Sequence, residues 1–255
     1  MPLYEECLAK RKRVLGFEHP DTLASLNDVA VLLYFTNEKE RALPLYEECL
    51  AKRKRVLGDE HPDTLSSLNN LAEFFRFKPD FDRALPLYEE CLVIQQRIFG
   101  EEHPDTLASL DSVAKMLCGK GEYHRALPLF EECLAKRKRV LGDDHPDTSD
   151  TLNNLAELFH NKGDYNRALP LLEQCLAMRK DELGDGHPFT LTTLGNLADV
   201  LNSMAQYDRA LPLYEECLAK QTVVFGANSS ETTKTKTARD QCVKKRQASK
   251  KCSIM

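Results

Sequence analysis

The sequence has no tryptophan and no apolar run long enough to cross a membrane. It shows no Gly-rich phosphate loop, no nucleophile elbow and no closely spaced Cys or His ligands for a metal. A formal net charge of −5 argues against general nucleic-acid binding. No signal peptide is recognisable at the N-terminus. We therefore expect a cytoplasmic protein that is not an enzyme, with no cofactor, no metal and no nucleic-acid partner.

What the sequence does contain is one motif repeated at a fixed spacing. The dipeptide His-Pro begins at positions 19, 61, 103, 145 and 187. The tetrapeptide Arg-Ala-Leu-Pro begins at positions 41, 83, 125, 167 and 209. Both series therefore repeat every 42 residues without a gap. A period of this size indicates a solenoid, in which each unit buries its apolar face only against its neighbours.

Each repeat reads as two antiparallel helices. Gly58 is placed to end one helix, and Pro62 and Asp63 suit the first turn of the next. Apolar residues then recur at a spacing of three to four, beginning with Leu65. A proline such as Pro44 falls inside each second helix, where it removes a hydrogen bond unless the helix starts late or bends. The pattern predicts an all-α fold, an α-solenoid of helix pairs.

The fourth repeat carries the residues of a known family. The motif LNNLAELF occupies residues 152–159, and Gly163, Tyr165, Ala168 and Cys175 follow it. This pattern resembles a tetratricopeptide repeat, whose usual period is about 34 residues. The longer repeat with His-Pro-Asp-Thr is similar to the kinesin light chain subfamily, also seen in nephrocystin-like proteins. The resemblance covers about residues 1–226 and implies a right-handed superhelix. The coiled coil that would bind a kinesin heavy chain is absent, so a motor role is not implied.

The repeats divide the chain into four parts. Residues 1–18 form a partial repeat with a second helix only, which we interpret as a fragment or an early start. Five repeats follow at 19–226. Residues 227–243 keep the length of a helix but replace leucines with Thr, Lys and Arg, as a capping helix with a polar outer face requires. Residues 244–255 are a basic tail.

Two recurring features of the second helices receive a structural interpretation. Six cysteines share one register and are expected to be buried free thiols, since stacked copies about 10 Å apart exceed the ~7 Å limit of a disulfide. These are Cys7, Cys49, Cys91, Cys133, Cys175 and Cys217.

Four-residue basic runs recur at 10–13, 52–55 and 136–139. We interpret them as a solvated helix face, with nuclear localisation or phosphate binding as the alternative.

The resemblance implies that the first helices line a concave groove that binds peptides. An asparagine amide both donates and accepts, so it can pair with both groups of an extended peptide backbone. In the alternative, paired asparagines only tolerate exposure and link neighbouring first helices. The candidate groove residues are Asn27, Asn69, Asn70, Glu73, Arg76, Lys115, Asn153, Asn154, Glu157, Asn196 and Asp199. The function expected is a non-catalytic scaffold or adaptor for protein interactions.

The charge of this groove predicts the charge of its ligand. Only Arg76 and Lys115 are basic at the inward positions. The acidic residues are Asp28, Glu73, Asp111, Asp150, Glu157 and Asp199. We therefore expect a neutral or basic peptide rather than an acidic one.

The last four residues suggest a second function. Cys252-Ser253-Ile254-Met255 fits the C-a-a-X pattern for prenylation, with methionine favouring farnesyl. Five basic residues stand just upstream and would supply the second signal that stable binding to an anionic membrane surface needs. The alternative function is thus a membrane-tethered signalling scaffold with Cys252 lipidated. In the other interpretation, Cys252 is an accidental cysteine in a disordered tail, or the terminus comes from a wrong gene model.

Overall fold

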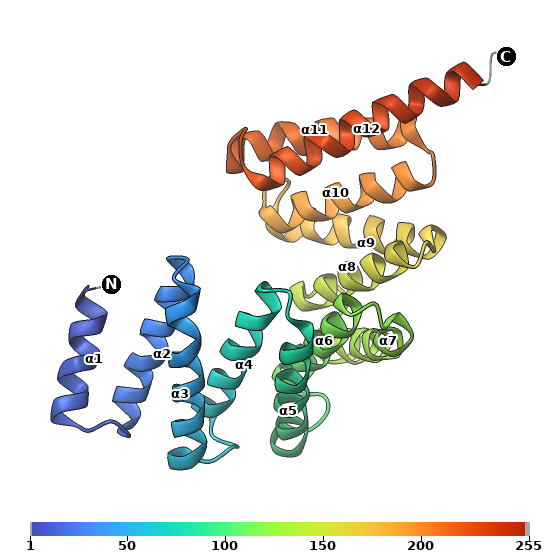
Figure 1. Ribbon diagram of the computed structural model, residues 1–255. Helices are drawn as coiled ribbons and strands as arrows, with labels where there is room; N and C mark the ends of the chain where they lie inside the picture. The colour runs from blue at the N-terminus through green and yellow to red at the C-terminus, as the bar shows by residue number, and fades with distance from the viewer. Residues whose placement is uncertain (1, 253–255) are drawn as a thin grey trace. The chain divides into compact units, whose positions relative to one another are not determined.

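The computed structural model describes residues 2–252, and every regular element in that range is an α-helix (Figure 1). The bounds are α1 Pro2–Val14, α2 Pro20–Phe35, α3 Lys39–Leu57, α4 Pro62–Phe77, α5 Phe81–Phe99, α6 Pro104–Gly119, α7 Tyr123–Val140, α8 Pro146–Asn161, α9 Tyr165–Leu183, α10 Pro188–Ser203, α11 Tyr207–Phe225 and α12 Ser230–Cys252. These bounds confirm the predicted solenoid of tandem helix pairs. The right-handed superhelix stays a prediction.

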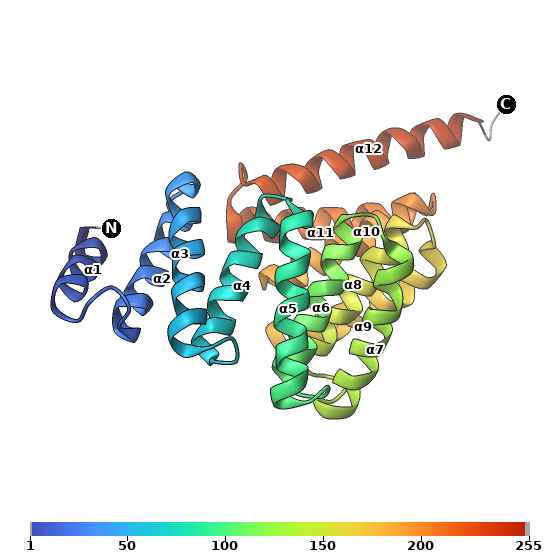
Figure 2. The same cartoon turned by 60° about the horizontal axis from the view of Figure 1, so that its bottom comes forward.

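The helices form two compact units, Met1–Leu129 and Phe130–Met255, with the boundary inside α7. In the first unit, consecutive helices from α1 to α6 pack against one another (Figure 2). In the second unit, the same is true of consecutive helices from α8 to α12. Each helix therefore buries its apolar face mainly against its sequence neighbours, as a solenoid requires.

The first helix of each repeat begins with the same cap. The proline of His-Pro is the first helical residue, as predicted, and the histidine before it is the N-cap. Each histidine Nδ1 accepts a hydrogen bond from the backbone N–H two residues later, at 3.1 to 3.3 Å. Sequence reasoning gave these histidines no role. Their position directly before a proline at N1 could have identified them as N-caps, because a hydrogen-bond acceptor is favoured there.

The second helices end at glycines, as predicted. Gly58 has φ +89° and ψ 165°, so its positive φ is confirmed, although its ψ is extended rather than left-handed helical. A side chain at such a φ would be strained, which explains the glycine. Pro44 lies inside α3, which already begins at Lys39. The idea that this helix starts late, after the proline, is therefore wrong.

The register cysteines are buried free thiols at five of six positions, namely Cys49, Cys91, Cys133, Cys175 and Cys217. The Cys49 Sγ donates to the carbonyl oxygen of Leu23 at 3.4 Å. Burial raises the pKa of Cys217 to about 11. The prediction is wrong for Cys7, which is exposed. Its helix, α1, is the first described helix, so no earlier helix covers the thiol as α2 covers Cys49.

The basic runs are not simply a solvated face. Arg53 and Arg137, from two of the runs, are each only 4% exposed. The Arg53 Nη1 donates to the Asp63 carbonyl oxygen and to Ser67 Oγ, both at 2.8 Å. The interpretation is therefore wrong for one arginine in each of the runs 52–55 and 136–139. That arginine faces the next first helix, and its donors satisfy polar groups there that would otherwise be unpaired.

The helix after the last repeat is longer than the sequence suggested. We expected a capping helix at 227–243 and a separate tail, but α12 runs from Ser230 to Cys252. The segment contains no glycine or proline that would end the helix. Cys242 is fully buried, and Arg246 forms an ion pair with Asp208 of α11. Residues 253–255 of the predicted lipidation motif, and the Cys252 side chain, lie outside the described part of the chain.

Candidate functional site

The predicted groove residues divide between the two units, so each unit has its own candidate surface. In the first unit they lie on α2, α4 and α6, and in the second on α8 and α10. The members in the first unit are Asn27, Asn69, Asn70, Glu73, Arg76 and Lys115. The members in the second unit are Asn153, Asn154, Glu157, Asn196 and Asp199.

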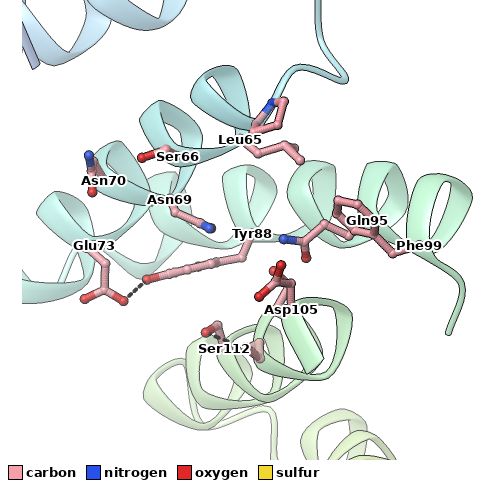
Figure 3. Close-up of a pocket in the computed structure, with 13 residues that line it drawn as sticks. Leu65, Ser66, Asn69, Asn70, Glu73, Tyr88, Gln95, Phe99, Asp105 and Ser112 are labelled. Atoms are coloured by element: carbon pink, nitrogen blue, oxygen red, sulfur yellow. Dashed lines mark hydrogen bonds between the residues drawn. The ribbon is translucent and has the colours of Figure 1, made fainter. Parts of the chain in front are cut away.

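The first unit has a pocket of about 500 Å³ between α4, α5 and α6 (Figure 3). Three predicted residues line it, namely Asn69, Asn70 and Glu73. The other predicted members in this unit are not part of the lining. The second helix α5 also contributes Tyr88 and Gln95, which the sequence analysis did not select. The pocket is therefore built from both helices of a repeat and from the first helix of the next.

Asparagines link neighbouring first helices in both units. Asn70 Nδ2 donates to Asn27 Oδ1 at 3.0 Å, joining α4 to α2. Asn196 Nδ2 donates to Asn153 Oδ1 at 3.2 Å, joining α10 to α8. Asn153 is only 8% exposed, so the main role of its amide is the hydrogen bond to Asn196. The links between first helices that the alternative interpretation expected are thus present at these two places, and Asn69 and Asn70 line the pocket.

A tyrosine from the second helix holds the acidic residue of the first. In the first unit, the Tyr88 hydroxyl donates to Glu73 Oε1. Arg76 donates to Glu73 Oε2 from Nε at 2.9 Å and from Nη2 at 2.5 Å. Burial, followed by the charge of Glu73, raises the pKa of Tyr88. Arg76 is consequently a partner of Glu73 and not a free cation in the groove.

The second unit repeats this pair without the arginine. The Tyr214 hydroxyl donates to Asp199, and Asn202 stands where the first unit has Arg76. Burial raises the pKa of Asp199, although the bond from Tyr214 and the charge of His160 act in the opposite direction. Asp199 therefore carries a poorly compensated charge when it is ionised.

Asp199 lies in a second pocket, of about 390 Å³, between α8, α9 and α10. Asn153, Glu157 and Asn196 also line this pocket. Leu172 occupies the register position of Tyr88 and Tyr214, so it offers Glu157 no hydroxyl. Glu157 is exposed. Asn154 is not among the lining residues of this pocket.

Three of the remaining charged residues, namely Lys115, Asp111 and Asp150, form ion pairs within the chain. Lys115 Nζ lies 2.7 Å from Asp111 Oδ2, and Asp111 is buried. Asp150 forms an ion pair with Arg179. Both basic residues predicted for the groove are therefore paired with carboxylates, while Asp28 and Glu157 are exposed. At the predicted groove positions, carboxylates therefore outnumber basic side chains.

The residues that sequence reasoning missed come from second helices, such as Tyr88 and Gln95, and from the first helix α6, namely Asp105 and Ser109. It placed the groove on first helices alone, whereas Tyr88, Gln95 and Tyr214 complete the surfaces. A signal was available for Gln95, which replaces the arginine present at 11, 53, 137 and 179. Among the described residues, no group of three or more His, Cys, Asp or Glu side chains could hold a metal ion. The side chains gathered here offer hydrogen bonds and negative charge.

Stacked helix pairs with polar pockets on their first helices define an α-solenoid of the protein-interaction class. The tetratricopeptide repeat family profile matches residues 1–21, 22–63, 63–135, 108–181 and 160–222. The chain belongs to the tetratricopeptide repeat family, and its repeats are of the kinesin light chain-like kind. No curated protein matches the chain.

Solved structures share this fold. The nearly identical TPR-like repeats assigned to a Podosopora anserina kinesin light chain are 28% identical, with a TM-score of 0.66 over 81% of this chain and 98% of that one. BtubC (BKLC) from P. vanneervenii is 19% identical, with a TM-score of 0.71 over 90% and 92%. A Rap protein complexed with Competence and Sporulation Factor is 12% identical, with a TM-score of 0.68 over 92% and 71%.

Proposed function

We propose that this protein is a non-catalytic adaptor that binds extended peptide segments of other proteins on its first-helix surfaces. The observation that carries the proposal is the pocket between α4, α5 and α6, lined by Asn69, Asn70 and Glu73. Asn70 gives one amide hydrogen to Asn27 and keeps further hydrogen-bonding capacity for a ligand. A peptide backbone, with alternating N–H and C=O groups, is the complementary ligand.

The fold supports a role in protein interactions. Solenoids of this kind present extended surfaces to their partners. The neighbour Rap was solved in complex with Competence and Sporulation Factor, which is a property of that protein and shows that the fold is compatible with a bound partner. The kinesin light chain-like repeats are consistent with an adaptor role, and a kinesin heavy chain is not part of the proposal.

The charge of the surfaces favours a neutral or basic peptide. Arg76 and Lys115 are each paired with a carboxylate of the same helix, so neither is free to hold an acidic ligand. Glu157 is exposed, and Asp199 is held by a tyrosine hydroxyl rather than by an arginine or lysine. An acidic peptide would add like charge, whereas a basic one would relieve the repulsion.

Fluorescence polarisation with a library of labelled nine-residue peptides tests this function. We expect binders among neutral and Lys- or Arg-containing peptides, and weaker binding of matched peptides with Glu in their place. Asn69→Ala and Asn70→Ala should each weaken binding about tenfold, which corresponds to one lost hydrogen bond. Asn166→Ala, at an exposed asparagine of α9, is the matched control and should leave binding unchanged. A library without binders, or tighter binding of the acidic peptides, would refute the proposal.

A membrane-tethered scaffold is the second candidate, and the exposed lysines near the end of α12 favour it. Lys244, Lys245 and Lys250 are exposed on this helix, close to Cys252. Each basic residue near an anionic leaflet contributes about 1 kcal/mol, which would supplement a lipid on Cys252. No helix in the described range is long and apolar enough to cross a bilayer.

Cell fractionation of the natural protein and its Cys252→Ser variant tests this tether. We expect the natural protein in the membrane fraction and the variant in the supernatant, because one lipid and a basic patch act together. Cys242→Ser is the control, since that thiol is buried against the fold and cannot be the lipid site. The tether would be refuted by equal distribution of the natural protein and Cys252→Ser between the two fractions, or by mass spectrometry that finds Cys252 unmodified.

A further inference from the structure

An internal arginine of the second helix bridges to the next first helix at a fixed register. Its Nη1 donates to the carbonyl oxygen ten residues later and to the hydroxyl fourteen residues later. Arg137 reaches the Asp147 carbonyl oxygen and Thr151 Oγ1, both at 2.7 Å. Arg179 reaches the Phe189 carbonyl oxygen at 3.1 Å and Thr193 Oγ1 at 2.6 Å. Arg11 and Arg53 make the same two contacts with their own neighbours.

In α5 this register position is Gln95. Its amide carries no charge and is shorter than a guanidinium. The two groups that an arginine would reach are the Asp105 carbonyl oxygen and Ser109 Oγ, ten and fourteen residues later. Ser109 Oγ instead donates to the thiol of Cys91 at 3.6 Å. The arginine bridge is therefore missing between α5 and α6.

The pocket of the first unit occupies the place of this bridge. Gln95, Asp105 and Ser109 all line it. Gln95 is only 5% exposed, and its buried Oε1 has no hydrogen-bond partner among the described residues. Figure 3 shows the Gln95 amide extending from α5 beside Tyr88, with Asp105 of α6 facing it across the space. A buried acceptor without a donor costs free energy, and a ligand that donates to it would recover that cost.

We propose that this pocket binds the guanidinium group of an arginine side chain in a peptide ligand. The ligand would supply in trans the group that the protein provides from its own chain at four other repeats. Its donors would meet the Asp105 carbonyl oxygen, Ser109 Oγ and Gln95 Oε1, and its charge would face the Asp105 carboxylate. This inference rests on the proposed peptide-binding function and names the residue that the first unit recognises.

The chemistry of the pocket favours arginine over lysine. A guanidinium presents five donors in a planar fork, so it can serve several acceptors around a narrow space at once. An ammonium group is a compact charge that keeps its hydration and cannot span the same acceptors. Phe99 also lines the pocket; one face of its ring stacks on His103 with the centroids 4.6 Å apart, which leaves the other face for a guanidinium.

The test uses short probes that differ only at one residue. Acetyl-Gly-Ser-Arg-Ser-Gly-amide is titrated into the full chain, alongside the same peptide with lysine or citrulline, and the glutamine side-chain amide signals are followed by NMR. We expect the arginine peptide to bind about tenfold more tightly than either analogue. The shifted signals should include the Gln95 amide, which Gln95→Leu identifies by its absence.

Two matched variants locate the site. Gln95→Arg restores the internal bridge and fills the pocket, so it should weaken binding of the arginine peptide about tenfold or more without lowering the melting temperature. Asn166→Arg places an arginine at an exposed position of α9, in the other unit, and should leave binding unchanged. Gln95→Leu keeps the pocket but removes its acceptor, so it should also weaken binding of the arginine peptide. This second variant tests the site even where Gln95→Arg does not fold.

The outcomes separate this inference from the function on which it rests. Equal affinity for the arginine, lysine and citrulline peptides would overturn it, as would unchanged binding to Gln95→Arg and Gln95→Leu. If the nine-residue library still yields binders that depend on Asn69 and Asn70, the adaptor function stands without the arginine pocket. If no peptide of either set binds, both proposals fall.

Discussion

Replacing Arg179 with alanine is expected to lower the free energy of unfolding of the second unit by about 2–4 kcal/mol. The Arg179 guanidinium is 4% exposed and holds three helices together. It contacts Ser149 Oγ and the Asp150 carboxylate of α8, and Thr193 Oγ1 of α10. Alanine would leave these buried acceptors without a donor. It would also create a cavity between the three helices. Hydrogen bonds to a buried charge are among the costliest to lose.

Urea denaturation, followed by circular dichroism, measures this change. Hydrogen exchange in α9 and α10 should accelerate more than in α4 and α5, because a solenoid unfolds by neighbouring units. The control is Arg209→Ala, since Arg209 is exposed and its Nη2 lies 3.2 Å from Glu173 Oε1. Exposed pairs contribute about 0–1 kcal/mol, so the control should change little. Equal effects of the two substitutions would contradict the importance of the buried arginine.

The second large effect concerns the Tyr214–Asp199 pair of the second unit. Tyr214→Phe is expected to destabilise the protein by about 1–3 kcal/mol at neutral pH, because a half-buried carboxylate would lose its donor. Asp199→Asn should instead be at least as stable as the natural protein at pH 7, since asparagine accepts the same bond without burying a charge. Both variants keep the size of the side chain, so packing is preserved.

The difference between Asp199→Asn and the natural protein should grow as the pH rises. Burial raises the pKa of Asp199 above its ordinary value of 3.8, so the folded protein holds this proton more tightly than the unfolded chain. Its contribution to stability is present below the unfolded pKa and is lost as the pH rises through the folded pKa. The urea midpoint of the natural protein should therefore fall relative to that of Asp199→Asn between pH 4 and pH 7.

The corresponding pair in the first unit supplies the control. Glu73 accepts from Arg76 as well as Tyr88, so its charge is compensated. Glu73→Gln should lose the bonds to Arg76 and become less stable at pH 7, opposite in sign to Asp199→Asn. A gain in stability for Glu73→Gln, or a pH-independent difference for Asp199→Asn, would contradict this account.

The repeat fold was readable from the sequence because its determinants are local. Proline at N1 and glycine after the last turn set helix ends without help from distant residues. Apolar spacing then identified which faces are buried. The same reasoning failed at Cys7, whose register predicted burial that only a preceding helix could supply. It also ended a helix near residue 243, although nothing in 227–252 breaks α12.

The candidate site was only partly readable. The first-helix positions were identified by resemblance, and Asn69, Asn70 and Glu73 do line a pocket. The pairing of Asn70 with Asn27, 43 residues away, could not be derived from one repeat. Nor could the hydroxyl of Tyr88 be assigned to Glu73 from the sequence. Such contacts join side chains on different helices, and their partners depend on how the helices stack.

The sequence by itself determined the period, the two helices of each repeat, the capping of their ends and the apolar stripes, because these follow from backbone geometry and from residues within a few turns. Only the tertiary structure decided which polar groups are satisfied. It buried Arg53 and Arg179 against the next first helix, and it left a buried acceptor at Gln95. The physical reason is that satisfying a buried polar atom requires a partner from a neighbouring helix, within hydrogen-bond reach.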